Sequence, residues 1–157
     1  MEISRAKNED IDEILVLLNE VLEIHHNIRP DIFMEGKTKY TKEMLRGMIK
    51  DDNNPIYVAK EDKVLGYAFC KLQEVPFSTT MVPFKSLFID DLCVDKNIRS
   101  KGVGKALFEY VKNEAIRLGC YEVTLNVWEG NESAINFYKK MNMQIKEYQM
   151  EYILNKD

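Results

Sequence analysis

The stretch between Asp91 and Leu107 constrains the fold of this 157-residue chain more than any other. An apolar run ends at Val94, a polar turn with two glycines follows, and apolar residues then recur at helical spacing up to Leu118. This pattern predicts a strand, a glycine-bearing turn and the N-terminus of a helix. Unpaired backbone N–H groups and the helix dipole meet at such a turn, so it favours a phosphate or pyrophosphate ligand.

The residues of the turn suit that ligand. Gly102 and Gly104 let oxygens approach the backbone closely, and Arg99, Lys101 and Lys105 supply positive charge. Neither common nucleotide fingerprint fits, because the dinucleotide pattern needs a third glycine three residues after Gly104 and the Walker pattern needs wider glycine spacing. An ordinary strand-to-helix turn is the alternative that these residues alone leave open.

A second motif lies downstream of the first. Residues 131–143 read Asn-Glu-Ser-Ala-Ile-Asn-Phe-Tyr-Lys-Lys-Met-Asn-Met. Together with Arg-x-x-Gly-x-Gly at residues 99–104, this segment resembles the acetyl-CoA-binding motifs of the GNAT superfamily of N-acetyltransferases, over roughly residues 1–154. The one departure is Asn142-Met143, where the family usually has Gly-Phe. Asparagine tolerates the left-handed conformation that ends helices, and methionine is an apolar replacement.

The order of the expected elements predicts an α/β chain with an α+β mixed sheet. Strands are expected at 2–6, 56–60, 64–72, 86–94 and 121–128, with two more within 144–154, and helices at 8–23, 41–50, 102–118 and after Asn131. The resemblance implies the GNAT-like acyl-CoA N-acyltransferase fold, a mostly antiparallel sheet splayed at two parallel strands and flanked by helices. Gly66 indicates a bulge or a close backbone approach. For the apolar loop 74–85, folding onto the core is favoured over a mobile flap above the acceptor site.

Length and composition indicate a single domain over residues 1–157, with 45% hydrophobic and 31% charged residues. No apolar run approaches the roughly 20 residues of a membrane span and no secretory signal is visible, so we expect a cytoplasmic protein without a membrane partner. A net charge of −4 argues against a nucleic-acid partner and fits a cationic substrate. Cys70, Cys93 and Cys120 lack metal-ligand spacing and are expected to be buried thiols, so no metal is expected.

The resemblance implies how acetyl-CoA would bind. The pantetheine arm would lie beside the backbone of Leu92 and Val94, and the Leu92 N–H is the candidate donor to the acetyl oxygen. Tyr138 would lie beside the departing sulfur and donate a hydrogen bond or a proton to it, with plain packing of an interfacial tyrosine as the alternative. The implied cofactor contacts include Arg99, Ser100, Lys101, Gly102, Val103, Gly104, Lys105, Asn131, Ala134, Phe137 and Tyr138.

The acceptor amine needs a base, because an alkylamine with a pKa near ~10 is almost fully protonated at neutral pH. Asp90 and Asp91 are the best candidates, and strand alternation predicts that one of them faces the site unless a bulge intervenes. Glu129 is the next candidate, and surface ion pairing is the alternative for both aspartates. In relatives that acetylate ribosomal-protein N-termini, a catalytic glutamate occupies the position of Asn126, so that substrate is disfavoured.

The segment after the first helix carries both histidines of the chain, and in similar enzymes it helps to wall the acceptor pocket. Neighbouring histidines on a helix diverge by about 100° and rarely share one metal ion, and packing at a helix end is the alternative role. The candidate substrate-binding residues are His26, Arg29, Asp90, Trp128 and Glu129.

These observations predict an acetyl-CoA-dependent N-acetyltransferase that transfers acetyl to a primary amine by direct attack in a ternary complex. A polyamine, an aminoglycoside-like compound, a small amino compound or a protein lysine would each be a compatible acceptor, and the sequence leaves homodimerisation open. The alternatives are a non-catalytic acyl-CoA-binding sensor or interaction module on the same fold, and a phosphate-binding or nucleotide-binding protein of another fold, which the failed fingerprints disfavour.

Overall fold

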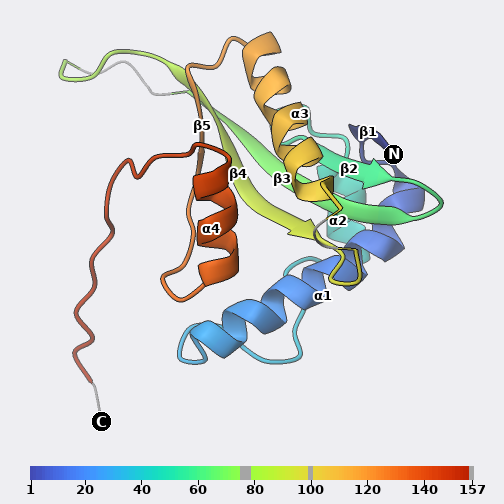
Figure 1. Ribbon diagram of the computed structural model, residues 1–157, viewed down its shortest axis with the longest axis horizontal. Helices are drawn as coiled ribbons and strands as arrows, with labels where there is room; N and C mark the ends of the chain where they lie inside the picture. The colour runs from blue at the N-terminus through green and yellow to red at the C-terminus, as the bar shows by residue number, and fades with distance from the viewer. Residues whose placement is uncertain (75–78, 99–100, 156–157) are drawn as a thin grey trace.

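A computed structural model describes residues 1–74, 79–98 and 101–155 (Figure 1). Five strands form one sheet in the order β1-β2-β3-β4-β5. Neighbouring strands are antiparallel except β4 and β5, which are parallel. The elements are β1 Glu2–Arg5, a 3-10 turn at Asn8–Asp10, α1 Ile11–Ile28, α2 Lys42–Met48, β2 Ile56–Lys60, β3 Val64–Glu74, β4 Lys85–Val94, α3 Val103–Arg117, β5 Glu122–Leu125 and α4 Glu132–Lys140. The expected mixed sheet is confirmed.

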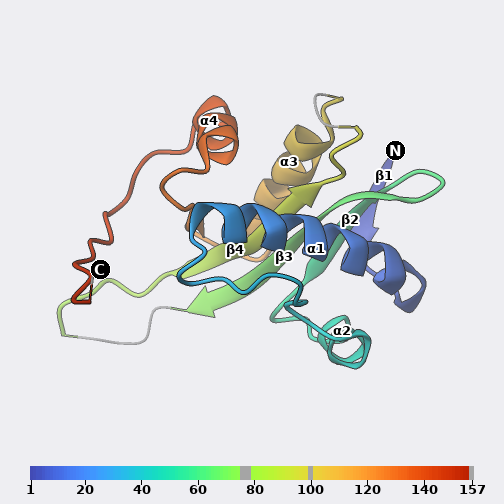
Figure 2. The ribbon, with the colours of Figure 1, turned by 90° about the horizontal axis from the view of Figure 1, so that it is seen from below.

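The helices cover both faces of the sheet. Leu18 of α1 and Leu45 of α2 pack with Tyr67 in one buried cluster, whereas Phe108 of α3 packs with Ala68 in another. Tyr67 and Ala68 are successive residues of β3, and side chains alternate between the faces of a strand. The sheet therefore separates an α1/α2 side from an α3 side, and Figure 2 shows α1 crossing the first of these.

The first helix is longer than the sequence indicated. We expected it to end near Glu23, but α1 continues to Ile28. Ile24 and Ile28 extend its apolar spacing, and Pro30 then stops it, because proline disfavours helical conformation in the preceding residue. The extra turn contains both His25 and His26.

Gly66 has both features that its position predicted. The register of β2 and β3 shifts beside it, between Ala59 and Lys60. A Cβ atom at Gly66 would lie 2.8 Å from the carbonyl oxygen of Cys93 and 3.0 Å from Leu107 Cδ1. Glycine therefore lets β3 approach the end of β4 and α3 closely.

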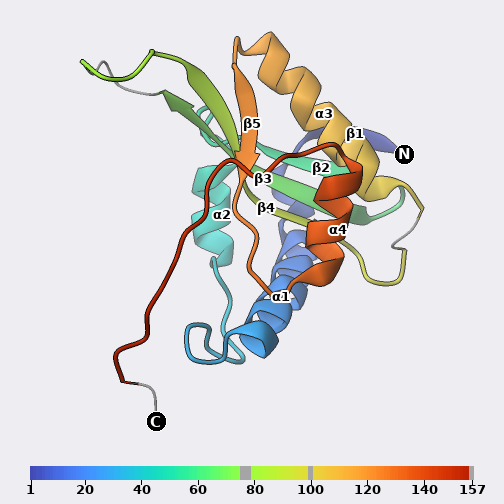
Figure 3. The same cartoon turned by 60° about the vertical axis from the view of Figure 1, so that its left-hand side comes forward.

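Two strand predictions at the C-terminal side were wrong. The strand expected at 121–128 ends at Leu125, and residues 144–154 form no strand. Both failures have one physical cause, since a strand needs a neighbour to pair with. The pairing of β5 with β4 stops at Leu125. Residues 144–155, the C-terminal arm, leave the body of the molecule after α4 (Figure 3).

The expectation for the loop 74–85 was also wrong in its described part. Met81 and Val82 are 51% and 78% exposed, so they do not fold onto the core. Phe84 does pack, with its ring 5.6 Å from that of Tyr121. Pro76 and Phe77 lie outside the described residues. As expected, Cys70 and Cys93 are buried thiols, while Cys120 is partly exposed.

Candidate active site

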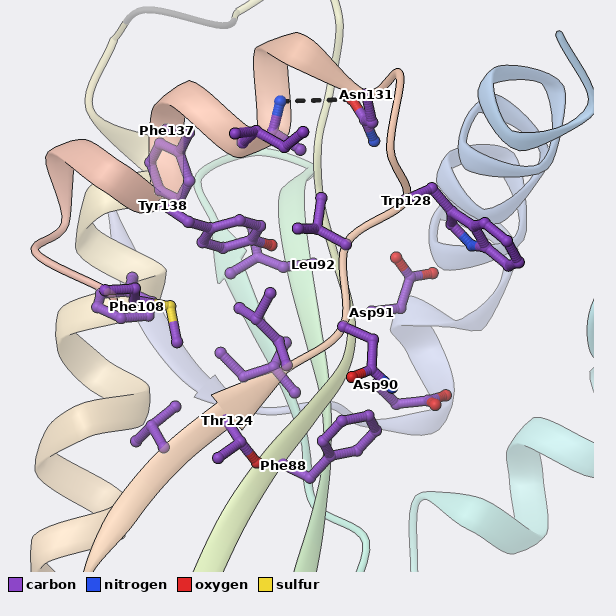
Figure 4. A pocket seen from close by; sticks show the side chains of 18 of the residues that line it. Phe88, Asp90, Asp91, Leu92, Phe108, Thr124, Trp128, Asn131, Phe137 and Tyr138 are labelled. Atoms are coloured by element: carbon purple, nitrogen blue, oxygen red, sulfur yellow. Dashed lines mark hydrogen bonds between the residues drawn. The ribbon is translucent and has the colours of Figure 1, made fainter. Parts of the chain in front are cut away.

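The two parallel strands separate partway along their length. Their registered pairs run from Ser86 and Glu122 to Ile89 and Leu125, where the pairing ends. The rest of β4 then borders an opening that is also lined by residues of α1, α3, α4 and the segment after β5. Figure 4 shows the Tyr138 ring pointing toward Leu92, with Asp90 and Asp91 beyond Leu92.

A bulge in β4 places both aspartates on the same side of the sheet. Asp91 lies opposite Phe69 and Ile89 lies opposite Cys70, so Asp90 is an extra residue in the ladder. Both carboxylates consequently bind partners from the α1/α2 side. Strand alternation alone would have divided them between the two faces, so this bulge decides the geometry of the site.

The Asp91 carboxyl has a pKa well above that of an ordinary aspartate. Burial raises its pKa to about 6, assisted by the charge of Asp90, while a hydrogen bond from Tyr67, the charge of Lys39 and the backbone amide of Leu92 act in the opposite direction. The Tyr67 hydroxyl donates to Asp91 Oδ2 across 2.7 Å. A carboxyl with this pKa is mostly ionised at neutral pH and is more basic than an ordinary aspartate.

Asp90 binds an ammonium group of the protein itself. Lys39 Nζ lies 3.0 Å from Asp90 Oδ2, and the Tyr40 hydroxyl lies 3.4 Å from the same oxygen. Lys71 Nζ is 3.9 Å from the other carboxylate oxygen. Burial alone would lower the pKa of Lys39, but the hydrogen bond and charge of Asp90 outweigh it and raise the pKa. The opening can therefore hold an alkylammonium ion.

Tyr138 enters the opening from α4. Asn131 caps this helix as predicted, since its side chain accepts a hydrogen bond from the Ala134 amide at 3.3 Å. Burial raises the pKa of Tyr138 well above its usual value, and the nearby Asp91 and Cys93 act in the same direction. The phenol is therefore protonated at neutral pH and serves as a hydrogen-bond donor.

The turn before α3 has the backbone that the motif predicted. Gly102 has a φ of 81° and precedes the first residue of the helix. A Cβ atom at Gly104 would lie 3.2 Å from the ring of Phe137, so a larger residue here would press against α4. Gly102, Val103, Gly104 and Lys105 line the opening, and Lys101 is exposed. The predicted contacts of Arg99 and Ser100 lie outside the described residues.

Backbone amides, the helix dipole and two glycines suit this turn to a pyrophosphate. The first amides of α3 have no partner within the helix, and the helix dipole favours an anion there. The left-handed Gly102 and the side-chain-free Gly104 keep the backbone accessible. Ala134 and Phe137 line the same opening from α4. These features fit the diphosphate end of coenzyme A.

Aromatic and charged side chains form the other end of the opening. The Arg29 guanidinium lies 5.7 Å from the centroid of the Trp128 ring, and Phe33 meets Trp128 edge-on at 5.4 Å. Arg29 also binds Asp31 and Glu151 at 2.8 and 2.6 Å. Arg29, Trp128 and Glu129 line the opening as residues that we expected to contact substrate. The substrate-binding role of each stays a prediction.

The two histidines differ in their surroundings. His26 directs Nδ1 to the carbonyl oxygen of Phe33 at 2.7 Å. His25, which the sequence did not distinguish from it, lines the opening, and its ring lies 5.1 Å from that of Phe33 at a tilt of 33°. Burial and the charge of Lys39 lower the pKa of His25, so its imidazole is neutral at pH 7.

Lys39 and Tyr67 are the residues that sequence reasoning missed. Lys39 lies in an irregular segment, and Tyr67 has the apolar surroundings of a core strand residue. The alternation of side chains along β3 predicts which residues share a face with Tyr67. Only the register between β3 and β4 shows that Tyr67 meets Asp91.

The described residues contain no group of three or more histidine, cysteine, aspartate or glutamate side chains able to hold a metal ion. Across the same residues, no helix combines the length and apolar character that crossing a bilayer requires.

Comparison with known proteins agrees with this geometry. Residues 18–143 match the sequence profile of the Acetyltransferase (GNAT) family. The peptidyl-lysine N-acetyltransferase YjaB of Escherichia coli is 23% identical over 145 residues, which are 92% of this chain and 83% of that protein. The L-ornithine N5-acetyltransferase NATA1 of Arabidopsis thaliana is 36% identical over 67 residues, 42% of this chain, and the match spans only 29% of that protein.

A solved structure is similar over the whole fold. The BH1408 protein of Bacillus halodurans superposes with a TM-score of 0.94 at 27% sequence identity. The match covers 99% of this chain and 100% of that one.

Proposed function

Since the chain belongs to the acetyltransferase (GNAT) family, we propose that it transfers an acetyl group from acetyl-CoA to a primary amine on a small molecule or a peptide. The observation that carries the proposal is that a partly buried carboxyl of raised pKa, Asp91, and a protonated phenol, Tyr138, line one opening. One group accepts the proton that the amine must lose, and the other donates to the leaving sulfur.

The donor would occupy the gap between β4 and β5. The amides at residues 101–105 would hold its diphosphate, and the exposed edge of β4 at Leu92 would run beside its pantetheine arm. Acetyl-CoA would supply the thioester carbonyl that the amine attacks. The backbone amide of Leu92 lowers the pKa of the Asp91 carboxyl by a hydrogen bond. We propose in addition that this amide donates a hydrogen bond to the acetyl oxygen.

The acceptor would enter from the α1/α2 side. Lys39 already places an alkylammonium on Asp90, so the same carboxylate would bind the ammonium of a substrate that displaces it. This favours an amine at the end of an alkyl chain. YjaB is a peptidyl-lysine N-acetyltransferase and NATA1 is an L-ornithine N5-acetyltransferase, and the acceptor groups in these names are primary alkylamines.

Proton removal is the demanding step. An alkylamine with a pKa near ~10.4 faces a carboxylate with a pKa of about 6, a difference of roughly four units or on the order of 6 kcal/mol. Burial of the ammonium lowers its pKa, whereas the charge of Asp90 raises it, as both do for Lys39. Asp91, directly or through a water molecule, would take the proton, and the Tyr138 hydroxyl would stabilise the thiolate by a hydrogen bond.

Free-thiol release from acetyl-CoA tests the proposal. The panel contains Nα-acetyl-lysine, ornithine, a polyamine and an aminoglycoside, with a tertiary amine as the control that cannot be acetylated. Amine-dependent release by at least one primary amine supports the proposal. If acetyl-CoA binds but none of the four primary amines gives release, the catalytic proposal fails and a non-catalytic acyl-CoA-binding module is favoured.

A further inference from the structure

A lysine of the chain itself lies where the acceptor amine would bind. Lys39 lines the opening, and its Nζ atom lies 3.0 Å from Asp90 Oδ2. The side chain is 44% exposed, so it is not locked into the core. Lys39 therefore presents a primary alkylamine, the group proposed as the acceptor, to the carboxylate proposed to bind it.

The residue after Lys39 fixes this position. Lys39 and Tyr40 belong to the irregular segment that passes from the end of α1 to α2 (Figure 2). The Tyr40 ring stacks on that of Phe69, with centroids 5.7 Å apart and planes 7° apart. Phe69 lies opposite Asp91 in the register of β3 and β4. Stacking on β3 therefore holds the segment beside the two aspartates.

The groups proposed for the chemistry lie near the Lys39 amine. The charge of Lys39 acts to lower the pKa of Asp91, which the bulge of β4 places on the same side as Asp90. Leu92 and Tyr138 line the same opening (Figure 4). Asp90 and Leu92 are two positions apart in one strand, so their Cα atoms lie at most roughly 7 Å apart. The flexible four-carbon side chain of a lysine can cover that distance.

Attachment to the chain gives this amine an advantage over a free acceptor. A group on a short flexible tether acts at an effective concentration on the order of millimolar, and a well-oriented group acts at a far higher one. A free amine must reach a comparable concentration to compete. Until it does, Lys39 is the amine that bound acetyl-CoA meets.

We propose that Lys39 is a self-acetylation site whose ε-amine attacks acetyl-CoA bound to the same chain, an inference that rests on the acetyltransferase function proposed above. Asp91 removes one proton from the ammonium, and the neutral nitrogen forms a bond to the thioester carbon. The carbon–sulfur bond breaks, and a second proton passes from the nitrogen to the sulfur. The products are Nε-acetyl-lysine, coenzyme A as the free thiol, and the one proton that Asp91 returns to water.

This modification changes the acceptor side of the opening. An amide carries no charge, so acetylated Lys39 no longer forms an ion pair with Asp90. The carboxylate is then available to the ammonium of an external acceptor. A second lysine, Lys71, lies 3.9 Å from the other oxygen of Asp90 but is not part of the lining of the opening, so it should stay unmodified.

Peptide mass spectrometry after incubation with acetyl-CoA, without any added amine, tests the inference. The measured quantity is the acetylated fraction of Lys39, whether it is present on purification or forms with time. Lys42 is the internal control, because it is 50% exposed and also pairs with an aspartate, Asp12, but lies outside the lining of the opening. Asp91→Asn, purified and incubated in the same way, is the control for catalysis.

Lys39 should be acetylated at least about tenfold faster than Lys42, and Asp91→Asn should slow the reaction at Lys39 by a similar factor. Equal acetylation of the two lysines would overturn the inference, because acetyl-CoA would then be reacting with surface amines unaided. Equal acetylation of Lys39 in the wild type and in Asp91→Asn would overturn it as well.

A mixture of two variants tests whether the reaction stays within one chain. Lys39→Arg keeps a cation beside Asp90 but has no amine to acetylate there, whereas Asp91→Asn keeps Lys39 but lacks the base. Lys39 of Asp91→Asn should stay unmodified in the presence of Lys39→Arg. Its acetylation in the mixture would show transfer between chains and would overturn the inference.

Thiol release with the external amines separates this inference from the proposed function. Release with an external amine, while Lys39 of the wild type stays unmodified, would overturn self-acetylation alone. If no external amine gives release and Lys39 also stays unmodified, both proposals fail.

Discussion

The hydroxyl group of Tyr67 donates a hydrogen bond to Oδ2 of Asp91 across 2.7 Å, between neighbouring strands of the sheet. Tyr67 is fully buried, and Asp91 is partly buried. The bond favours the ionised carboxylate, whereas burial favours the protonated acid. The balance of these two effects sets the basicity of the group to which we assign proton removal.

Replacing Tyr67→Phe should raise the pKa of Asp91 above about 6, because the hydrogen bond that lowers it is lost. Activity that needs the ionised carboxylate should then fall at slightly acidic pH, and the acid limb of the pH–rate profile should move to higher pH. Tyr57→Phe is the matched control, since Tyr57 is equally buried but contacts the α3 side. A profile that moves equally in both variants would contradict the role of Tyr67.

Replacing Asp91→Asn should stabilise the protein while it removes the base. A carboxyl whose pKa rises from 3.8 to about 6 on folding makes stability fall as pH rises through that interval. The penalty is complete at pH 7 and is on the order of 3 kcal/mol, an upper figure because Asn binds Tyr67 less well. Denaturant unfolding at pH 4 and pH 7 measures it: the gain should appear at pH 7 and shrink at pH 4. A variant less stable than wild type at pH 7 would contradict this account.

Tyr138→Phe should lower kcat about tenfold to a hundredfold while the affinity for acetyl-CoA changes little, because the hydroxyl acts on the leaving sulfur rather than in binding. Tyr121→Phe is the control, as Tyr121 is 80% exposed. Steady-state kinetics and calorimetric titration separate the two quantities. Full activity of Tyr138→Phe would remove this hydroxyl from the chemistry.

Gly102→Val should weaken acetyl-CoA binding at least tenfold, since a β-branched residue resists a φ of 81° and would distort the start of α3. Gly119→Val supplies the matched control: Gly119 has a φ of 75° and equally open surroundings, but it follows the other end of α3. Both variants should lose similar stability. Equal affinities in the two variants would contradict the assignment of the diphosphate to this turn.

Lys39→Met should lower KM for the acceptor amine severalfold, because it removes the internal ammonium that occupies Asp90. Lys42→Met is the control, since Lys42 pairs with Asp12 at 2.8 Å on the surface. Initial rates at varied amine concentration provide the measurement. An increase in KM would show that Lys39 helps to bind the acceptor instead of competing with it.

The sequence predicted the parts of the site that are local along the chain. The strand, turn and helix around Gly102 and the cap of α4 at Asn131 follow from spacing and from the conformations these residues prefer. The bulge at Asp90 could not be predicted from local sequence, because it depends on the register between β4 and β3. Tyr67 and Lys39 were missed for the same reason, since each meets its aspartate through a long-range contact.

The C-terminal arm illustrates a different limit. Its alternating apolar residues predicted strands that the structure does not show, because a pattern within one chain does not say whether an edge is available for a strand to join. In the isolated chain the segment has no paired neighbour among the described residues.

Thiol release from acetyl-CoA with Nα-acetyl-lysine, measured for the wild type and for Asp91→Asn at pH 7, tests the central claim most directly. The account predicts amine-dependent release by the wild type and a loss of about a hundredfold or more in the variant, with acetyl-CoA affinity preserved. Equal rates in the two proteins would contradict the assignment of Asp91 as the group that accepts the proton of the amine.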